Sequence, residues 1–299
     1  MKREQVTCYF CGETGAAVRK ISDGFFGDIQ EIRLRINRPI AISMGNTIRY
    51  VTADGQLTYN PETALKVSEK DLRQTFEAVC GYSLHSFKNE INEGFVTVNG
   101  GHRVGLCGTS VIRGGTVENV KNISSLNFRI AREIKGCAEE ICGRVFSSGL
   151  QSLLIAGPPS CGKTTVLRDL TRIMGGRYKV AVIDERGELA ACCSGVPQND
   201  IGANTDIFDG YDKPHGIMTA VRVMSPQLVV CDEIGSEEDM AAVKTAANSG
   251  VYTAATIHAA SLDELERKGI GTDIFGSIAF LNGLGHISRI MKRTVNGYA

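Results

Sequence analysis

The chain has 299 residues, of which 42% are hydrophobic, and its 33 basic residues balance its 33 acidic residues. This length suits two compact domains, and the balanced charge gives no overall attraction to nucleic acid or to an anionic membrane. A nucleic-acid translocase is therefore disfavoured. No apolar stretch is long enough to span a bilayer and the N-terminus has no hydrophobic signal core, so we expect any membrane role to be peripheral.

Ten cysteines are placed in ways that argue against a disulfide framework. Cys161 lies in a glycine-rich loop and Cys231 directly precedes two acidic residues, where a crosslink would distort the chain. A reducing cytoplasm is the expected compartment. Cys8 and Cys11 have the spacing of metal ligands, but no second such pair completes a tetrahedron, which disfavours a structural zinc.

The first half of the chain predicts short strands and turns around helices. Apolar and charged residues alternate over residues 31–36, as in a strand with one buried face. Ser68 followed by Asp71 predicts the start of a helix, and Asn99-Gly100-Gly101 predicts a hairpin turn. The expected strands span residues 31–36, 39–44, 47–52, 95–98 and 103–112. We therefore expect a mixed α+β N-terminal domain.

Polar residues 119–125 and the segment 126–133 predict a linker into the second half. We place the boundary near residue 140, which gives an N-terminal domain with its linker over 1–140 and a second domain over 141–299. Arg129 and Arg132 fall in this linker. They either reach a nucleotide bound by the same or a neighbouring subunit, or form a solvated basic turn.

Residues 157–164 contain the complete phosphate-loop pattern G-x-x-x-x-G-K-[ST], directly after the apolar run 152–156. A buried strand leads into a loop whose backbone N–H groups turn inward, and the helix that follows directs its positive end to the same point. Lys163 would reach the β- and γ-phosphates of ATP, the Thr164 hydroxyl would ligate Mg²⁺, and Thr165 would bond the α-phosphate. The expected phosphate-binding residues are Gly157, Pro158, Pro159, Ser160, Cys161, Gly162, Lys163, Thr164 and Thr165.

Two further apolar runs end in acidic residues. Residues 227–231 precede Asp232 and Glu233, the pattern in which the first acid holds Mg²⁺ and the second orients a water molecule. Residues 178–183 precede a charged segment that contains Glu185 and Glu188. Because ligands gather at the carboxyl ends of the strands in such sheets, these acids are predicted to share one site.

Residues 251–257 predict another strand, which ends at His258. This histidine senses the γ-phosphate, links the site to a neighbour, or merely caps the strand. Polar residues at the ends of several strands in one half of the chain predict one convergent site.

These segments resemble the ATPases of type II and type IV secretion and of type IV pilus retraction. Asp184, Glu185 and Glu188 match their acidic box, and residues 256–258 match their Thr-x-His box. Residues 182–190 and 93–105 resemble, more narrowly, the stage III sporulation protein AA family of endospore-forming bacteria. The secretion ATPases commonly have glycine where this chain has Asp232, so either Glu188 or Glu233 could activate the attacking water.

The resemblance implies an α/β fold with a RecA-like P-loop ATPase domain after a mixed α+β domain. It also implies ATP and Mg²⁺ as cofactors, a role for Arg222 at an inter-subunit site, and a homo-oligomer, expected to be a hexamer. The implied function is to power a secretion-like channel between mother cell and forespore. The chain would lie in the mother-cell cytoplasm and reach the membrane through integral membrane components of that channel. The alternatives are a nucleotide-gated scaffold with negligible turnover and a nucleic-acid translocase.

Overall fold

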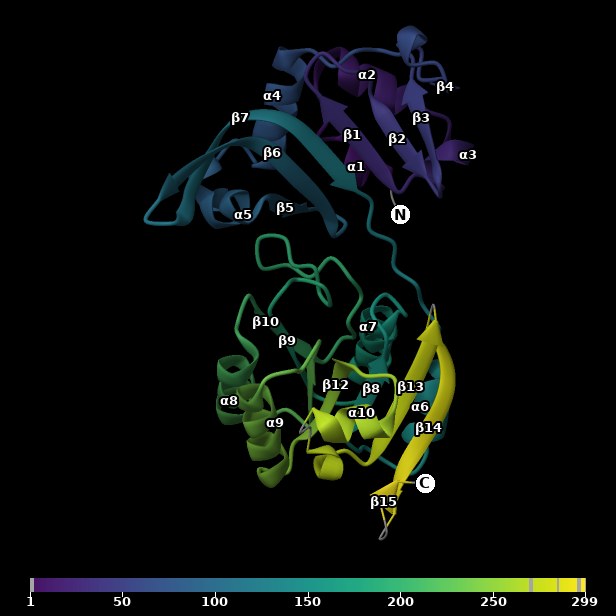
Figure 1. Cartoon of the computed structure of the whole chain (residues 1–299), viewed down its shortest axis with the longest axis vertical. Coiled ribbons are helices and arrows are strands. Elements are labelled where there is room, and N and C mark those ends of the chain that lie inside the picture. Colours follow the sequence, from purple (N-terminus) through teal and green to yellow (C-terminus); the bar gives the residue numbers. More distant parts are fainter. Residues whose placement is uncertain (1–2, 269–270, 284, 295–296, 299) are drawn as a thin grey trace. The chain divides into compact units, whose positions relative to one another are not determined.

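The computed structural model describes residues 3–268, 271–283, 285–294 and 297–298. The chain forms two compact units, Met1–Arg132 (unit 1) and Glu133–Ala299 (unit 2), which Figure 1 shows in the colours of the sequence. The division therefore lies before residue 133, upstream of the predicted boundary near residue 140.

Unit 1 is built on a 7-stranded sheet in which every neighbouring pair is antiparallel. Its strand order is β4-β3-β2-β1-β7-β6-β5. The strands are β1 Glu31–Arg35, β2 Ala41–Met44, β3 Thr47–Val51, β4 Leu57–Thr58, β5 Phe95–Val98, β6 His102–Arg113 and β7 Thr116–Arg129. The helices are α1 Glu4–Thr7, α2 Gly12–Lys20, α3 Asp23–Phe26, α4 Glu69–Val79 and α5 Lys88–Glu93, with short 3₁₀ turns at Pro61–Thr63 and Leu84–Phe87.

Local sequence explains the elements of unit 1. Ile32 and Leu34 alternate with charged residues along β1, and both side chains are fully buried in the core. The Ser68 hydroxyl accepts the Asp71 N–H at 3.0 Å and so caps the start of α4 as predicted. The hairpin that joins β5 to β6 was likewise predicted.

The predicted linker over residues 119–133 is wrong for most of its length. Residues 116–129 form β7, which pairs with β6 with two register shifts and with β1 from Ser125 onward. Phe128 is fully buried, and its ring centroid lies 4.3 Å from that of Phe10. The polar sequence was interpreted as a linker because the end of β6 and the start of β7 form a two-stranded ribbon whose residues are mostly exposed. Such a ribbon has the composition of a loop.

Unit 2 contains an 8-stranded sheet of order β10-β9-β11-β12-β8-β13-β14-β15. The strands from β10 to β13 in this order are parallel, and β14 and β15 continue the sheet antiparallel. The strands are β8 Leu153–Gly157, β9 Val180–Asp184, β10 Thr205–Asp209, β11 Leu228–Cys231, β12 Tyr252–His258, β13 Ser277–Gly283, β14 His286–Thr294 and β15 Gly297–Tyr298. The helices are α6 Glu139–Val145, α7 Lys163–Gly175, α8 Lys213–Met224, α9 Glu237–Asn248 and α10 Leu262–Arg267, and a 3₁₀ turn spans Thr272–Ile274.

The central strands of unit 2 are buried on both faces. In β8, Leu153 and Ile155 face the cluster formed with α6 and α7, whereas Leu154 and Ala156 face the cluster formed with α8, α9 and α10. The helices therefore cover both faces of the sheet (Figure 1). Burial on both sides explains why these strands are continuous apolar runs in the sequence.

The order of the strands decides which loops can meet. The strands β9, β11, β12 and β8 are consecutive neighbours and run parallel, so their carboxyl ends lie along one edge. The phosphate loop, the acidic segment, the Asp232-Glu233 pair and His258 follow those ends. One edge of the sheet thus collects side chains that are about a hundred residues apart in the chain.

Candidate functional site: a nucleotide site at the sheet edge of unit 2

The phosphate loop has the backbone that its sequence requires. Ser160 and Gly162 adopt positive φ values of 60° and 92°, which turn the chain sharply before α7 begins at Lys163. A Cβ atom at Gly157 would lie 2.7 Å from both the Cys161 sulfur and the Leu281 carbonyl oxygen. A larger residue at position 157 would therefore push the loop away from the sheet.

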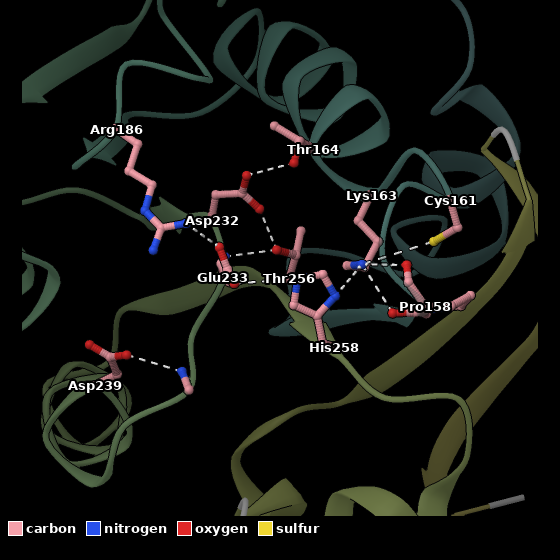
Figure 2. A network of polar contacts seen from close by, with 12 residues as sticks. Pro158, Cys161, Lys163, Thr164, Arg186, Asp232, Glu233, Asp239, Thr256 and His258 are labelled. Atoms are coloured by element: carbon pink, nitrogen blue, oxygen red, sulfur yellow. Dashed lines mark hydrogen bonds and ion pairs between the residues drawn. The ribbon is translucent and has the colours of Figure 1, made fainter. Parts of the chain in front are cut away.

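The Lys163 ammonium lies inside this loop, and the residue is only 6% exposed. Its Nζ atom donates to the carbonyl oxygens of Gly157 at 3.0 Å and Pro158 at 2.8 Å, and it lies 3.0 Å from Nδ1 of His258 (Figure 2). An ammonium group can only donate, so Nδ1 of His258 accepts and the ring proton lies on Nε2. That Nε2 atom lies 3.3 Å from a carboxylate oxygen of Glu233.

Asp232 is held by two hydroxyl groups. The Thr164 hydroxyl donates to one carboxylate oxygen at 2.7 Å, and the Thr256 hydroxyl donates to the other (Figure 2). The carboxylate therefore lies directly beside the first turn of α7, next to the loop that would hold the phosphates. Cys231, the preceding residue, is fully buried, and this burial raises the pKa of its thiol to about 12.

Glu233 adopts a left-handed backbone conformation, with φ of 53°. Its N–H donates to the Thr256 hydroxyl at 2.8 Å, and the next N–H, that of Ile234, donates to the Thr256 carbonyl at 2.9 Å. The Glu233 side chain accepts from Arg186 at 2.6 Å. A polar chain thus runs from Lys163 through His258 and Glu233 to Arg186.

The acidic segment after β9 is organised by Asp184, which is buried and only 2% exposed. Its carboxylate accepts the backbone N–H groups of Glu188, Leu189 and Ala190 at 2.8 to 3.2 Å. Arg168 of α7 donates to the Glu188 carbonyl at 2.6 Å. Asp184 is therefore a structural member of the acidic box, which shapes the loop that presents Glu185 and Glu188.

Glu185 contacts the site from the other side. Its carboxylate bonds the ammonium of Lys213, the first residue of α8. Burial of Lys213 favours its neutral form, but the Glu185 bond and the Asp239 charge outweigh that effect and raise its pKa above the usual value. A small cavity is lined by Glu185, Glu188, Asp232 and Glu233 among others. The predicted acidic residues therefore converge.

Of the two remaining predicted residues, Thr165 lies next to the phosphate loop and Arg222 lies away from it. Thr165 lies in the first turn of α7, and Arg222 lies exposed in the last turn of α8. Lys213 at the opposite end of that helix contacts Glu185, so Arg222 is roughly 13 Å from it along the helix axis. Arg222 therefore does not join the cluster within this chain.

The linker arginines bind groups of their own unit. Arg132 donates to the backbone carbonyls of Gly27 at 2.5 Å and Ile29 at 3.2 Å, and Arg129 lies 3.9 Å from Glu31. These contacts anchor the end of β7 within unit 1. The sequence had left the role of the two arginines open.

No role was predicted from the sequence for the Thr256 hydroxyl or for the side chains of Arg168, Arg186 and Lys213. Thr256 lies two residues before His258, and Arg186 lies within the charged segment 184–188. These positions were the only signal in the sequence for a role of either residue at the site. Nothing in the local sequence of Arg168 or Lys213 separates them from solvated helix residues. Only the packing of α7 and α8 against the sheet places them at the site.

The donor set fits Mg²⁺ and a polyphosphate. The Thr164 hydroxyl and the Asp232 carboxylate are hard oxygen ligands only 2.7 Å apart, and Mg²⁺ favours few protein ligands together with water and substrate phosphates. The phosphate loop supplies inward-turned backbone and the buried Lys163 ammonium. The same edge therefore offers an anion site beside a cation site.

Comparison with solved structures defines the class of fold. The chain is similar to the Legionella pneumophila ATPase DotB, with a TM-score of 0.54 and 13% identity over 90% of this chain and 74% of that chain. It is also similar to the pilus retraction motor PilT solved with bound ADP, with a TM-score of 0.56 and 14% identity over 91% of this chain and 77% of that chain. The fold is that of the RecA-like secretion and pilus ATPases, as predicted.

The family follows from sequence comparison. The family model described as Sporulation stage III, protein AA matches residues 2–284, and the chain belongs to this family. Stage III sporulation protein AA of Bacillus subtilis (strain 168) is 34% identical over 258 residues, which cover 84% of this chain and 80% of that protein. Protein SEEDLING PLASTID DEVELOPMENT 1 of Arabidopsis thaliana is 31% identical over 161 residues, 52% of this chain and 23% of that protein. The predicted family is confirmed.

Proposed function

We propose that the chain is a Mg²⁺-dependent ATPase that energises a sporulation channel between mother cell and forespore. The observation that carries the proposal is the direct contact of Thr164 with Asp232 beside the buried Lys163. When bound, Mg²⁺ would neutralise phosphate charge. Thr164 and Asp232 would hold the ion, Lys163 would pair with the β- and γ-phosphates, and a carboxylate of the acidic cluster would orient the attacking water.

Replacing Lys163 tests this proposal. Lys163→Ala removes the cation nearest to the β/γ oxygens, so we expect ATP affinity to fall by at least about a hundredfold, since charge-assisted bonds in a buried site are strong. Binding of a fluorescent ATP analogue and steady-state phosphate release measure the effect. Lys179→Ala, in the exposed segment before β9, is the matched control. Unchanged affinity in a folded Lys163→Ala protein would show that the loop is not the nucleotide site.

One observation favours a second candidate, a nucleotide-gated scaffold with negligible turnover. The Glu233 carboxylate is held by both Arg186 and His258. Both carboxylate oxygens are thereby occupied, one by the ion pair with Arg186 and the other by the neutral His258 ring, which leaves neither free to orient a water molecule in this arrangement. The scaffold would be favoured if the protein binds ATP tightly but releases no phosphate, both when it is dilute and when it is assembled into oligomers.

The cellular setting comes from the family and the resemblance described above. We propose that the protein works in the mother-cell cytoplasm as a hexameric ring and reaches the membrane through integral components of the channel. No helix among the described residues is both long and apolar enough to cross a bilayer. Balanced charge gives no support for a nucleic-acid substrate.

A further inference from the structure

A groove of about 610 Å³ lies in unit 1, among residues that take no part in the nucleotide site. One wall is the face of α4 that carries Arg73, Phe76 and Glu77. Another is formed by Leu84, the first residue of the 3₁₀ turn Leu84–Phe87, and by Lys88, the first residue of α5. Its volume falls within the range of roughly 300–1,000 Å³ that is typical of ligand sites. The groove is therefore large enough to hold several side chains of a binding partner.

The third wall is the edge of a β-strand. Residues 119–123 of β7 all line the groove. Over Asn119, Val120 and Lys121 the register with β6 is regular and successive side chains point to opposite faces. All three can therefore line one groove only if the backbone edge itself faces it, whereas Asn122 has a left-handed backbone with φ of 51° beside a register shift. This stretch of β7 pairs with β6 on one side. On the other side the Ser124 carbonyl accepts the N–H of Ile36, the residue after β1, at 3.1 Å, and pairing with β1 itself begins at Ser125.

Side chains satisfy part of this edge locally. The Val120 N–H donates to the side-chain oxygen of Asn119 at 2.9 Å, and the Asn92 side chain donates to the Glu118 carbonyl at 3.1 Å. Both bonds stand where a neighbouring strand would otherwise pair. They are made by exposed or half-buried amide groups, which an incoming backbone can displace.

The chemistry of the groove indicates the character of its occupant. Phe76 and Val120 are half-buried against the core, and Leu84 is 48% exposed at the rim. The rim carries Arg73, Lys88 and Lys121 against Glu69 and Glu77. Among the described residues, none of these three basic groups takes part in an ion pair.

We propose that this groove binds an extended segment of a partner protein, which adds to β7 as a further strand. Main-chain bonds to the free edge would give affinity, apolar side chains at alternate positions would contact Phe76 and Leu84, and acidic residues would meet the basic rim. This proposal concerns the docking of a partner and stands independently of the nucleotide chemistry.

The test uses the full chain and a short fluorescent peptide of alternating valine and glutamate. We expect measurable binding, and amide exchange in residues 118–124 should slow when the peptide is bound. A peptide of the same sequence with every backbone nitrogen methylated cannot donate to a strand edge, so its affinity should fall by about tenfold. A valine–lysine peptide should bind more weakly than the valine–glutamate peptide.

Two variants locate the binding. Leu84→Asp places a charge on the apolar rim, and Val120→Pro removes an N–H that does not bond β6, a substitution that strand edges tolerate. Each variant should weaken peptide binding by about tenfold. Because Leu84 is exposed, we expect Leu84→Asp to leave folding unaffected. Ile48→Asp, at an apolar residue of β3 that is 59% exposed, is the control. Absence of peptide binding, equal binding of the N-methylated peptide, or no effect of Leu84→Asp would overturn the proposal.

Discussion

At the scale of single residues, Glu233 shows how the site holds a strained conformation. A left-handed backbone at a residue other than glycine costs about 1–3 kcal/mol and persists only where the surroundings fix it. Thr256 supplies that constraint through both its hydroxyl and its carbonyl group. The strain turns the chain so that Asp232 and Glu233 both face the sheet edge, which a continuing strand would prevent by alternation.

Mutation can test whether Glu233 or Glu188 activates the attacking water. We expect Glu233→Gln to keep Mg-ATP binding and to slow phosphate release by at least about a hundredfold, because the amide keeps the size but cannot act as a base. Phosphate release at saturating ATP measures this. If turnover stays near that of the unaltered protein while Glu188→Gln abolishes it, Glu188 has the role instead.

Thr256 is predicted to be a positioning residue. Thr256→Val removes the hydroxyl between Asp232 and the Glu233 N–H, so kcat should fall by about tenfold to a hundredfold with a much smaller change in ATP affinity. Thr256→Ser restores the hydroxyl and should recover most of kcat. Unchanged kcat in Thr256→Val would contradict a role for the hydroxyl, and a loss in Thr256→Ser would mean that the methyl group, which Thr256→Val keeps, also matters.

At the scale of elements, loops at the sheet edge are fixed by buried polar groups of neighbouring elements. Asp184 at the end of β9 collects three N–H groups, and Arg168 ties the same loop to α7. In unit 1, His102 at the start of β6 accepts the Ala131 N–H at 3.0 Å and so anchors the segment after β7. The Arg168 and His102 contacts join residues that are distant in the chain, whereas Asp184 bonds residues only 4 to 6 positions further along it.

The burial of His102 predicts a pH dependence of stability. Burial lowers the pKa of His102 to about 4, below its usual value of 6.5. Between these values the unfolded chain binds a proton that the folded chain does not, so stability falls as the pH falls. The free energy of unfolding should drop by about 2 kcal/mol between pH 7 and pH 5.

Denaturant titrations at the two pH values measure this difference. His102→Gln keeps an acceptor for Ala131 without a titrating group, so it should flatten the dependence. His85→Gln, at an exposed histidine, should leave the dependence unchanged. A difference between pH 7 and pH 5 that is the same in His102→Gln as in the unaltered protein would contradict the assignment.

At the scale of the whole molecule, Arg222 lies away from the nucleotide site of its own chain, and we expect it to act at the site of a neighbouring subunit in an oligomer. We expect an ATP analogue to favour a larger species, because bound phosphate supplies charge for arginines of a neighbouring subunit. Mass photometry or sedimentation with and without the analogue measures this. Arg222→Ala should weaken the shift and lower turnover of assembled protein while ATP affinity of the dilute protein stays unchanged. Loss of affinity in the dilute protein would place Arg222 at its own site.

The sequence alone determined the fold class and the main chemical groups of the site. The key groups lie at the ends of apolar runs: the phosphate loop, the acidic residues after two further runs, and His258. Apolar runs and the spacing of glycines are local patterns that mark such features. The same patterns predicted β1, β2, β3, β5 and β6 of unit 1 and the cap of α4. These features depend on residues that are close in the chain.

Only the tertiary structure decided the rest. It assigned β7 to the sheet of unit 1, because the partner strands that bury Phe128 are remote in sequence. It joined Thr256 to Asp232 and Lys163 to His258, since strand order brings these loops together. It separated Arg222 from the cluster because α8 runs away from the edge. Contacts between distant segments are set by topology, which local propensity does not encode.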